Sequence, residues 1–261
     1  MTIATVFAGV LALVVGVTLG VLGGGGSVLT VPIFVYVLGV SAKSAVAMSM
    51  PVIGLTSAIG AIGHWRAGNV SWRPALTFGL MAMIGAFAGA RLARFLTGPQ
   101  QLVLLAVVMI GSAVSMLRPA RAAAESTAPD TSAIPAAPTS GGVLFLVSAL
   151  AVGVLTGLVG IGGGFLVVPA LVLFAKMPIR KAIGTSLAVI ALNALSGVAG
   201  YLGQASIDWV IVSWFTAIAS LGMIIGTRLS PRLPASALRR GFALLLLLLA
   251  LFMIWQHLTS P

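Results

Sequence analysis

Two glycine-rich stretches are the residues of this chain whose type and spacing point most directly to chemistry. The first runs from Gly20 to Ser27 and the second from Gly157 to Gly164. Neither matches a dinucleotide- or phosphate-binding loop, because no strand pattern precedes it and no Gly-Lys-Ser/Thr follows it. Each separates a long apolar segment from a short one, so we expect each to interrupt a helix inside a membrane. Irregular backbone at that depth is tolerated only where protein buries it or water reaches it.

A helix that begins at such an interruption points free N–H groups and the positive end of its dipole into the protein. Paired interruptions at matching places in two halves of a chain are typical of transporter binding sites. The sequence therefore predicts an anion site built from backbone amides, with helix breaks at Pro32 and Pro169. The substrate-binding residues predicted in the two turns are Gly23, Gly24, Gly25, Gly26, Ser27, Gly160, Gly162, Gly163 and Gly164.

Glycines also let membrane helices pack closely, which is the alternative interpretation of these stretches. We prefer that packing role for four Gly-xxx-Gly pairs, namely Gly16/Gly20, Gly85/Gly89, Gly153/Gly157 and Gly222/Gly226.

Polar side chains inside the apolar segments are the next candidates for contact with an anion. Ser49, Ser186 and Asn193 are predicted to bind substrate, with Thr56, Ser57 and Thr185 as polar neighbours. Such groups can hydrogen-bond the oxygens of a dehydrated anion, or they can bond a neighbouring helix or the i−4 carbonyl. Both alternatives stay open at this point.

Three basic side chains lie near the ends of apolar segments. Arg91 and Arg228 could attract anions at a mouth, or extend to lipid headgroups. His64 is a candidate titratable group, with an interfacial position as the alternative.

Residue types that are missing also constrain the function. The predicted spans hold no Asp or Glu, which disfavours coupling through intramembrane carboxylates. Cysteine is absent, and an intramembrane hydrolase would depend on His64 or His257, both near span ends. We therefore expect no enzyme, no catalytic residue, no metal and no cofactor. Outward movement of an anion needs none of these, because an inside-negative potential supplies about 2.3 kcal/mol per charge per 100 mV.

Composition identifies the environment that must position these residues. The chain is 60% hydrophobic and 7% charged, against about 25% charged residues in soluble domains. Its 14 Lys and Arg stand between apolar segments of roughly spanning length, where topology signals occur, rather than in a nucleic-acid-binding patch. We expect an all-α, polytopic helix bundle in the lipid bilayer of a bacterial inner membrane, with a homo-oligomer left open.

The chain is an internal duplication. A shift of 137 residues lays Gly16–Leu92 over Gly153–Leu229 and matches glycines, a proline, a tryptophan and an arginine. Shared hydrophobicity alone would not align those residue types. The predicted domains are a first repeat over 1–117, a flexible Ala/Pro/Ser/Thr linker over 118–140 and a second repeat over 141–261.

The number of spans depends on two short apolar segments, 27–39 and 165–175, which are too short to cross a bilayer upright as helices. If they do not cross, the chain has eight spans and its halves are parallel. If they cross, it has ten spans and inverted halves. We prefer eight, because matched basic positions such as Arg91 and Arg228 then face one compartment.

The order of these motifs resembles the sulfite exporter TauE/SafE family, also called the toluene-sulfonate uptake permeases. The resemblance rests on the repeated Gly-xx-Gly-x-Gly-Gly-xxxxx-Pro, the serines Ser49 and Ser186, and the repeated Gly-xxx-Gly-x-Arg. It implies a duplicated transporter of about eight spans for sulfite, sulfonates or related organosulfur anions, mostly in export. We expect alternating access around the two glycine turns. The alternatives are a passive anion channel and a membrane assembly subunit that transports nothing.

Overall fold

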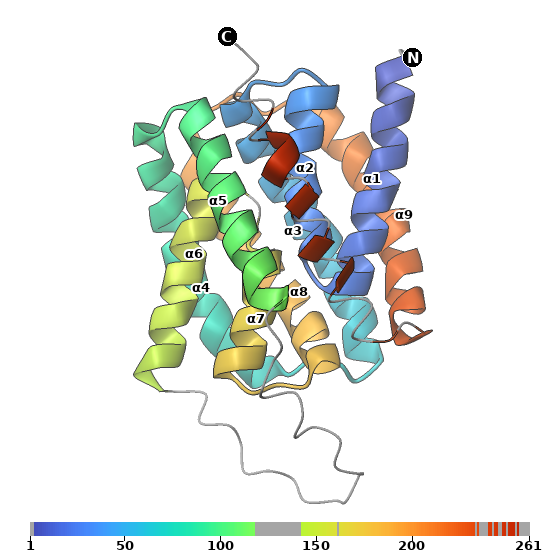
Figure 1. Cartoon of the computed structure of the whole chain (residues 1–261), viewed down its shortest axis with the longest axis vertical. Helices are drawn as coiled ribbons and strands as arrows, with labels where there is room; N and C mark the ends of the chain where they lie inside the picture. The colour runs from blue at the N-terminus through green and yellow to red at the C-terminus, as the bar shows by residue number, and fades with distance from the viewer. Residues whose placement is uncertain are drawn as a thin grey trace, which may run out of the picture.

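Helices account for the regular structure of the residues that are described. The computed structural model describes residues 3–117, 142–160 and 162–232, and scattered residues between 234 and 255. The predicted linker over 118–140 lies outside the described residues. Four described helices are long and apolar enough to cross a membrane: α3 (Ala42–Arg66), α4 (Trp72–Leu92), α8 (Ile179–Tyr201) and α9 (Trp209–Leu229). Figure 1 shows them with the shorter helices in one bundle, so the predicted all-α membrane fold is confirmed.

The shorter elements complete the bundle. They are α1 (Ile3–Leu22), η1 (Gly25–Leu29), α2 (Thr30–Pro32), η2 (Ile33–Val37), η3 (Ala93–Phe95), α5 (Gly98–Leu117), α6 (Val143–Val159), α7 (Gly164–Phe174) and η4 (Ser230–Arg232). The elements η1, α2 and η2 follow one another without a gap and make a continuous helical segment, Gly25–Val37.

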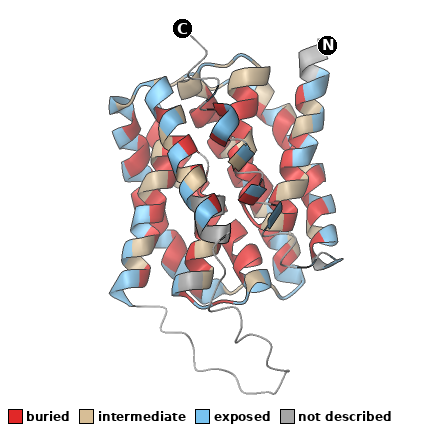
Figure 2. Ribbon diagram, in the orientation of Figure 1, coloured by how far each residue is buried: buried red, intermediate tan, exposed pale blue. Residues whose placement is uncertain are grey.

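Large apolar side chains cover the outside of the bundle. Val10 of α1, Ile84 of α4 and Leu221 of α9 are each more than half exposed. Figure 2 shows buried residues on the inward faces of the helices and exposed residues on the outward faces. An outer surface this apolar suits contact with lipid rather than with water.

The Gly-xxx-Gly pairs bring helices of the two halves into backbone contact. A Cβ added at Gly153 of α6 would overlap the carbonyl of Ala82 in α4, and one added at Gly222 of α9 would overlap the carbonyl of Leu13 in α1. The α4–α6 and α1–α9 packings are also the most extensive in the bundle. The packing role predicted for these pairs is confirmed.

The two longest helices, α3 and α8, cross in the middle of the bundle and run antiparallel. Gly54 of α3 faces Ala194 of α8, and Gly197 of α8 faces Met50 near the start of α3. Because α3 and α8 occupy equivalent places in the duplication, parallel halves would require them to run in the same direction. The contacts do not fit that preferred arrangement.

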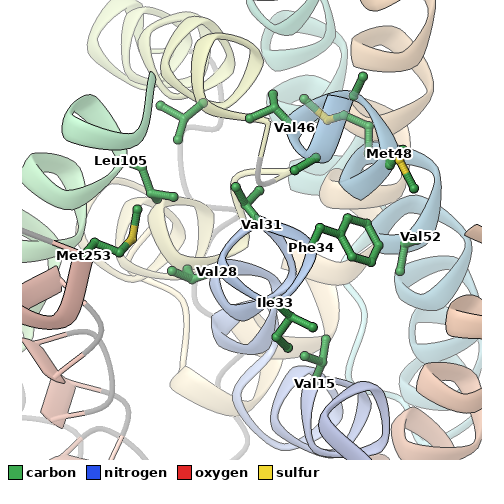
Figure 3. Packing of buried hydrophobic residues seen from close by; sticks show 14 of the residues in the cluster. Val15, Val28, Val31, Ile33, Phe34, Val46, Met48, Val52, Leu105 and Met253 are labelled. Atoms are coloured by element: carbon green, nitrogen blue, oxygen red, sulfur yellow. The ribbon is translucent and has the colours of Figure 1, made fainter. Parts of the chain in front are cut away.

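The segment Gly25–Val37 is fixed by apolar packing against its neighbours. Phe34 packs edge-on against Phe215 of α9, with ring centroids 4.9 Å apart. Figure 3 shows Val31 and Phe34 in one cluster with Val52 of α3. The cluster holds the chain that leaves the first glycine turn inside the bundle.

Gly153→Ala is expected to destabilise the α4–α6 contact by about 1–3 kcal/mol, because the new methyl group has no space beside Ala82. Thermal unfolding of the detergent-solubilised protein measures the change as a lower Tm. Gly111→Ala on α5 is the matched control, since its added Cβ meets nothing within 4 Å. Equal Tm values for the two variants would contradict the close packing.

Candidate functional site

The first helix break lies where α1 ends. Gly23 has φ 66° and Gly24 has φ 127°, backbone conformations that side chains with a Cβ rarely adopt. The helical segment Gly25–Val37 begins immediately after them. All the predicted site residues of this turn, from Gly23 to Ser27, are buried.

The second break has the same construction. Gly160, which ends α6, has φ 78°, and Gly162 and Gly163 have φ 64° and 79°. The chain then enters α7 at Gly164. These four glycines are buried as well.

The two prolines lie inside the short helices and not at the breaks. Pro32 closes α2 with helical φ and ψ values and leads into the π-helical turn η2. Pro169 lies in the middle of α7. The glycines interrupt the helices, because only they tolerate the positive φ values required there.

The two breaks meet in the interior. Gly24 and Gly164 lie so close that a Cβ added to either would overlap the Cα of the other. A Cβ added to Gly162 would meet Ile53 of α3 at 2.8 Å and Ile190 of α8 at 3.2 Å. Ile53 and Ile190 are equivalent in the duplication, so the breaks sit beside the crossing of α3 and α8.

Ser49 and Ser186 tie each break to the opposite half. The hydroxyl of Ser186 donates to the carbonyl of Gly23 at 2.5 Å and to that of Ile183 at 2.7 Å. The hydroxyl of Ser49 donates to the carbonyls of Gly160 and Val46. A hydroxyl has one proton to donate, and here two carbonyls share it. Each serine thereby satisfies a carbonyl left without a partner where a helix ends in the bundle.

His64 and Tyr201 repeat this arrangement one turn earlier. The Nε2 atom of His64 lies 3.4 Å from the carbonyl oxygen of Gly20. The hydroxyl of Tyr201 donates to the carbonyl of Gly157 at 2.9 Å. His64 is only 4% exposed, so its ring lies against the end of α1 and not at an open mouth.

Three buried polar side chains of α3 and α8, beside the crossing of the two helices, have no hydrogen-bond partner among the residues that the structure describes. Neither amide atom of Asn193 is bonded, and the hydroxyls of Thr56 and Ser57 are also unbonded. All three residues are at most 1% exposed. Leaving such groups unpaired costs about 1–3 kcal/mol each, so they call for an explanation.

These unbonded groups lie at the crossing of α3 and α8. Asn193 follows Ile190 by three residues and Thr56 follows Ile53 by three, so each shares a helix face with the isoleucine that borders Gly162. Asn193 and Thr56 are equivalent in the duplication. From the sequence we predict Ser49 and Ser186 as ligands, and Thr56 and Ser57 only as their polar neighbours. The alignment of Thr56 with Asn193 was the signal that could have reversed that order.

Backbone amides of the turns lie at the starts of the two short helical segments, where the first N–H groups of a helix have no intrahelical acceptor. Within the described part of the chain, no backbone hydrogen bond outside the helices is donated by the N–H groups of Gly25, Gly26, Gly162 or Gly163. Gly25 and Gly26 open the Gly25–Val37 segment, and Gly162 and Gly163 directly precede α7. The breaks therefore combine satisfied carbonyls with unbonded donors, an arrangement that can receive a negative charge.

The predicted mouth arginines lie at the exposed ends of helices that pack beside the last turn before each break: a Cβ added to Gly20 would overlap Thr227, and one added to Gly157 would overlap Ala90. Arg91 is exposed at the end of α4, with its guanidinium 5.3 Å from the ring centre of Phe87. Arg228 is exposed at the end of α9. A shallow apolar depression elsewhere holds none of the predicted site residues; it is lined by Pro99, Gln100, Val103, Leu104 and Val107.

Comparisons with known proteins agree on the class of protein. A probable membrane transporter protein of Xylella fastidiosa is 34% identical over 249 residues, covering 94% of this chain and 93% of that protein. The probable membrane transporter protein YdhB of Bacillus subtilis is 26% identical over 229 residues, covering 88% of this chain and 91% of that protein. A probable membrane transporter protein of Methanocaldococcus jannaschii is 27% identical over 245 residues, covering 85% of this chain and 88% of that protein. No solved structure matches the chain.

The match to a family extends through both halves of the chain and includes the two glycine turns. It covers residues 8–253. On this match, and on the similarity to the Xylella fastidiosa protein, the chain belongs to the sulfite exporter TauE/SafE family of membrane transporters.

Proposed function

We propose that this protein carries a small organosulfur anion, such as sulfite or a sulfonate, across the membrane by alternating access around its two glycine breaks. The observation that carries the proposal is the group of unbonded donors at the crossing of α3 and α8. Asn193, Thr56 and Ser57 supply neutral side-chain donors, and the turns supply backbone amides. An oxyanion accepts hydrogen bonds from all of them.

We infer further that the two halves, 1–117 and 141–261, form an inverted pair with ten crossings. The short segment after the first break supports this. Gly23 contacts Ile183 near the start of α8. At the other end of α8, the Oγ atoms of Ser44, near the start of α3, and Ser206 lie 3.2 Å apart. The segment between Gly23 and Ser44 therefore returns along most of the length of α8.

An inverted arrangement also assigns an orientation in the membrane. With ten crossings, only Lys43, Arg91 and Arg94 fall on one side, and the remaining Lys and Arg fall on the side of the linker. The positive-inside rule then makes the linker side cytoplasmic. Inverted repeats that meet at broken helices are a common basis for alternating access, because each half can adopt the conformation of the other.

The direct contact between Gly24 and Gly164 favours a carrier over a passive channel. Backbone that touches backbone at the point where the breaks meet leaves no path for an ion between them. Passage requires the two turns to separate, first toward one side and then toward the other.

Flux measurements with purified protein in liposomes test the function. We expect saturable efflux of sulfite or an alkylsulfonate, faster when the compartment that holds the anion is negative. A channel would give flux that rises in proportion to concentration, and an assembly subunit would give no flux above that of protein-free liposomes. Either result would contradict the carrier.

Asn193→Leu separates a ligand role from a packing role. If the amide binds the anion, the variant loses about tenfold or more of the flux at low substrate concentration, since a hydrogen bond to a charged group contributes about 1.5–3 kcal/mol. If the amide is only an unpaired core group, its apolar replacement raises the Tm and leaves flux unchanged. Asn69→Leu, in the loop between α3 and α4, is the matched control. Unchanged flux in Asn193→Leu would remove this residue from the site.

A further inference from the structure

We propose that this site accepts singly charged oxyanions and rejects doubly charged ones. It would carry bisulfite rather than the sulfite dianion, and sulfonates rather than sulfate. The inference rests on the proposed function and adds to it a rule for the charge of the substrate. This rule follows from the kinds of group beside the breaks, which are helix N-termini and neutral donors rather than charged side chains.

Charged and titratable side chains stand away from the crossing of α3 and α8. On α3, α4, α8 and α9, every such side chain lies in the first or last turn of its helix, and α1, α6 and α7 carry none in their described lengths. The charged and titratable residues of these four helices are Lys43, His64, Arg66, Arg73, Arg91, Arg180, Lys181, Tyr201 and Arg228. Tyr36 lies at the end of the Gly25–Val37 segment that is farther from the break.

Of these side chains, His64 and Tyr201 come nearest to the breaks, against the carbonyls of Gly20 and Gly157. The positive potential where Gly24 meets Gly164 therefore comes mainly from the backbone. The N-terminus of a helix carries roughly half an elementary charge. Two helical segments begin at the breaks, Gly25–Val37 and the 11-residue α7, and the contact of Gly24 with Gly164 brings their first turns together. The C-terminal ends of α1 and α6 oppose this potential, although Ser186 and Ser49 bond the carbonyls of Gly23 and Gly160 there. The breaks therefore offer at most about one positive charge, which leaves at least one charge of a dianion uncompensated.

The unbonded side chains do not change this balance. The amide of Asn193 and the hydroxyls of Thr56 and Ser57 are neutral donors that are buried and without partners. They replace part of the hydration of an oxyanion but add no charge. The cost of moving an ion from water into a low-dielectric interior grows with the square of its charge, so a dianion loses about four times as much hydration energy as a monoanion.

The test uses the unmodified protein in liposomes and three anions. Methanesulfonate is a monoanion from pH 6 to pH 8, sulfate is a dianion over that range, and sulfite changes from mostly monoanion to mostly dianion near neutral pH. At low total concentration, we expect sulfite flux to fall about tenfold from pH 6 to pH 8, in step with the bisulfite fraction. Methanesulfonate flux should stay constant, and sulfate flux should not exceed that of protein-free liposomes.

Methanesulfonate is also the control for titration of the protein itself, including His64. Sulfite flux that is constant or rises toward pH 8, or sulfate flux equal to methanesulfonate flux, would overturn the charge rule while leaving the transport function in place. Absence of flux for every anion at both pH values would overturn the transport function and the charge rule with it.

Discussion

The structure depends on satisfying backbone polar groups where two helices stop inside the membrane region. A helix end leaves carbonyls without partners, and lipid offers none. Here the other half of the chain supplies a partner at each break, through Ser186 to Gly23 and through Ser49 to Gly160. Each half therefore completes the interrupted helix of the other, and the two glycine turns are held together at the centre of the bundle.

Satisfied carbonyls beside unbonded donors are the basis of the proposed preference for anions. The serine protons are shared among carbonyls, whereas the amide of Asn193 and the hydroxyls of Thr56 and Ser57 have no partner among the described residues. A cation would find few free acceptors along the tied carbonyls. An anion would find donors from both halves, and because Asn193 stands where the first half has Thr56, the two halves do not contribute equally.

The sequence predicted those features that depend on residue type alone. Glycine runs indicated the helix breaks, Gly-xxx-Gly pairs indicated the close packing of α1 with α9 and of α4 with α6, and composition indicated the membrane. Features that depend on contacts between the two halves could not be predicted from the sequence. Spacing cannot show that Ser49 bonds Gly160, or that Thr56 and Ser57 lack partners. The direction of α8 relative to α3 was also open, because the basic residues fit both topologies.

Alternating access requires the crossing of α3 and α8 to open to each side in turn, and labelling of a single buried thiol detects that opening. The chain has no cysteine, so Thr56→Cys introduces a single thiol at a position that is 1% exposed in this conformation. In a variant that retains flux, we expect this thiol to react with a membrane-impermeant reagent applied from either side, and to react more slowly when the transported anion is present. A thiol that stays unreactive from both sides during active transport would contradict it.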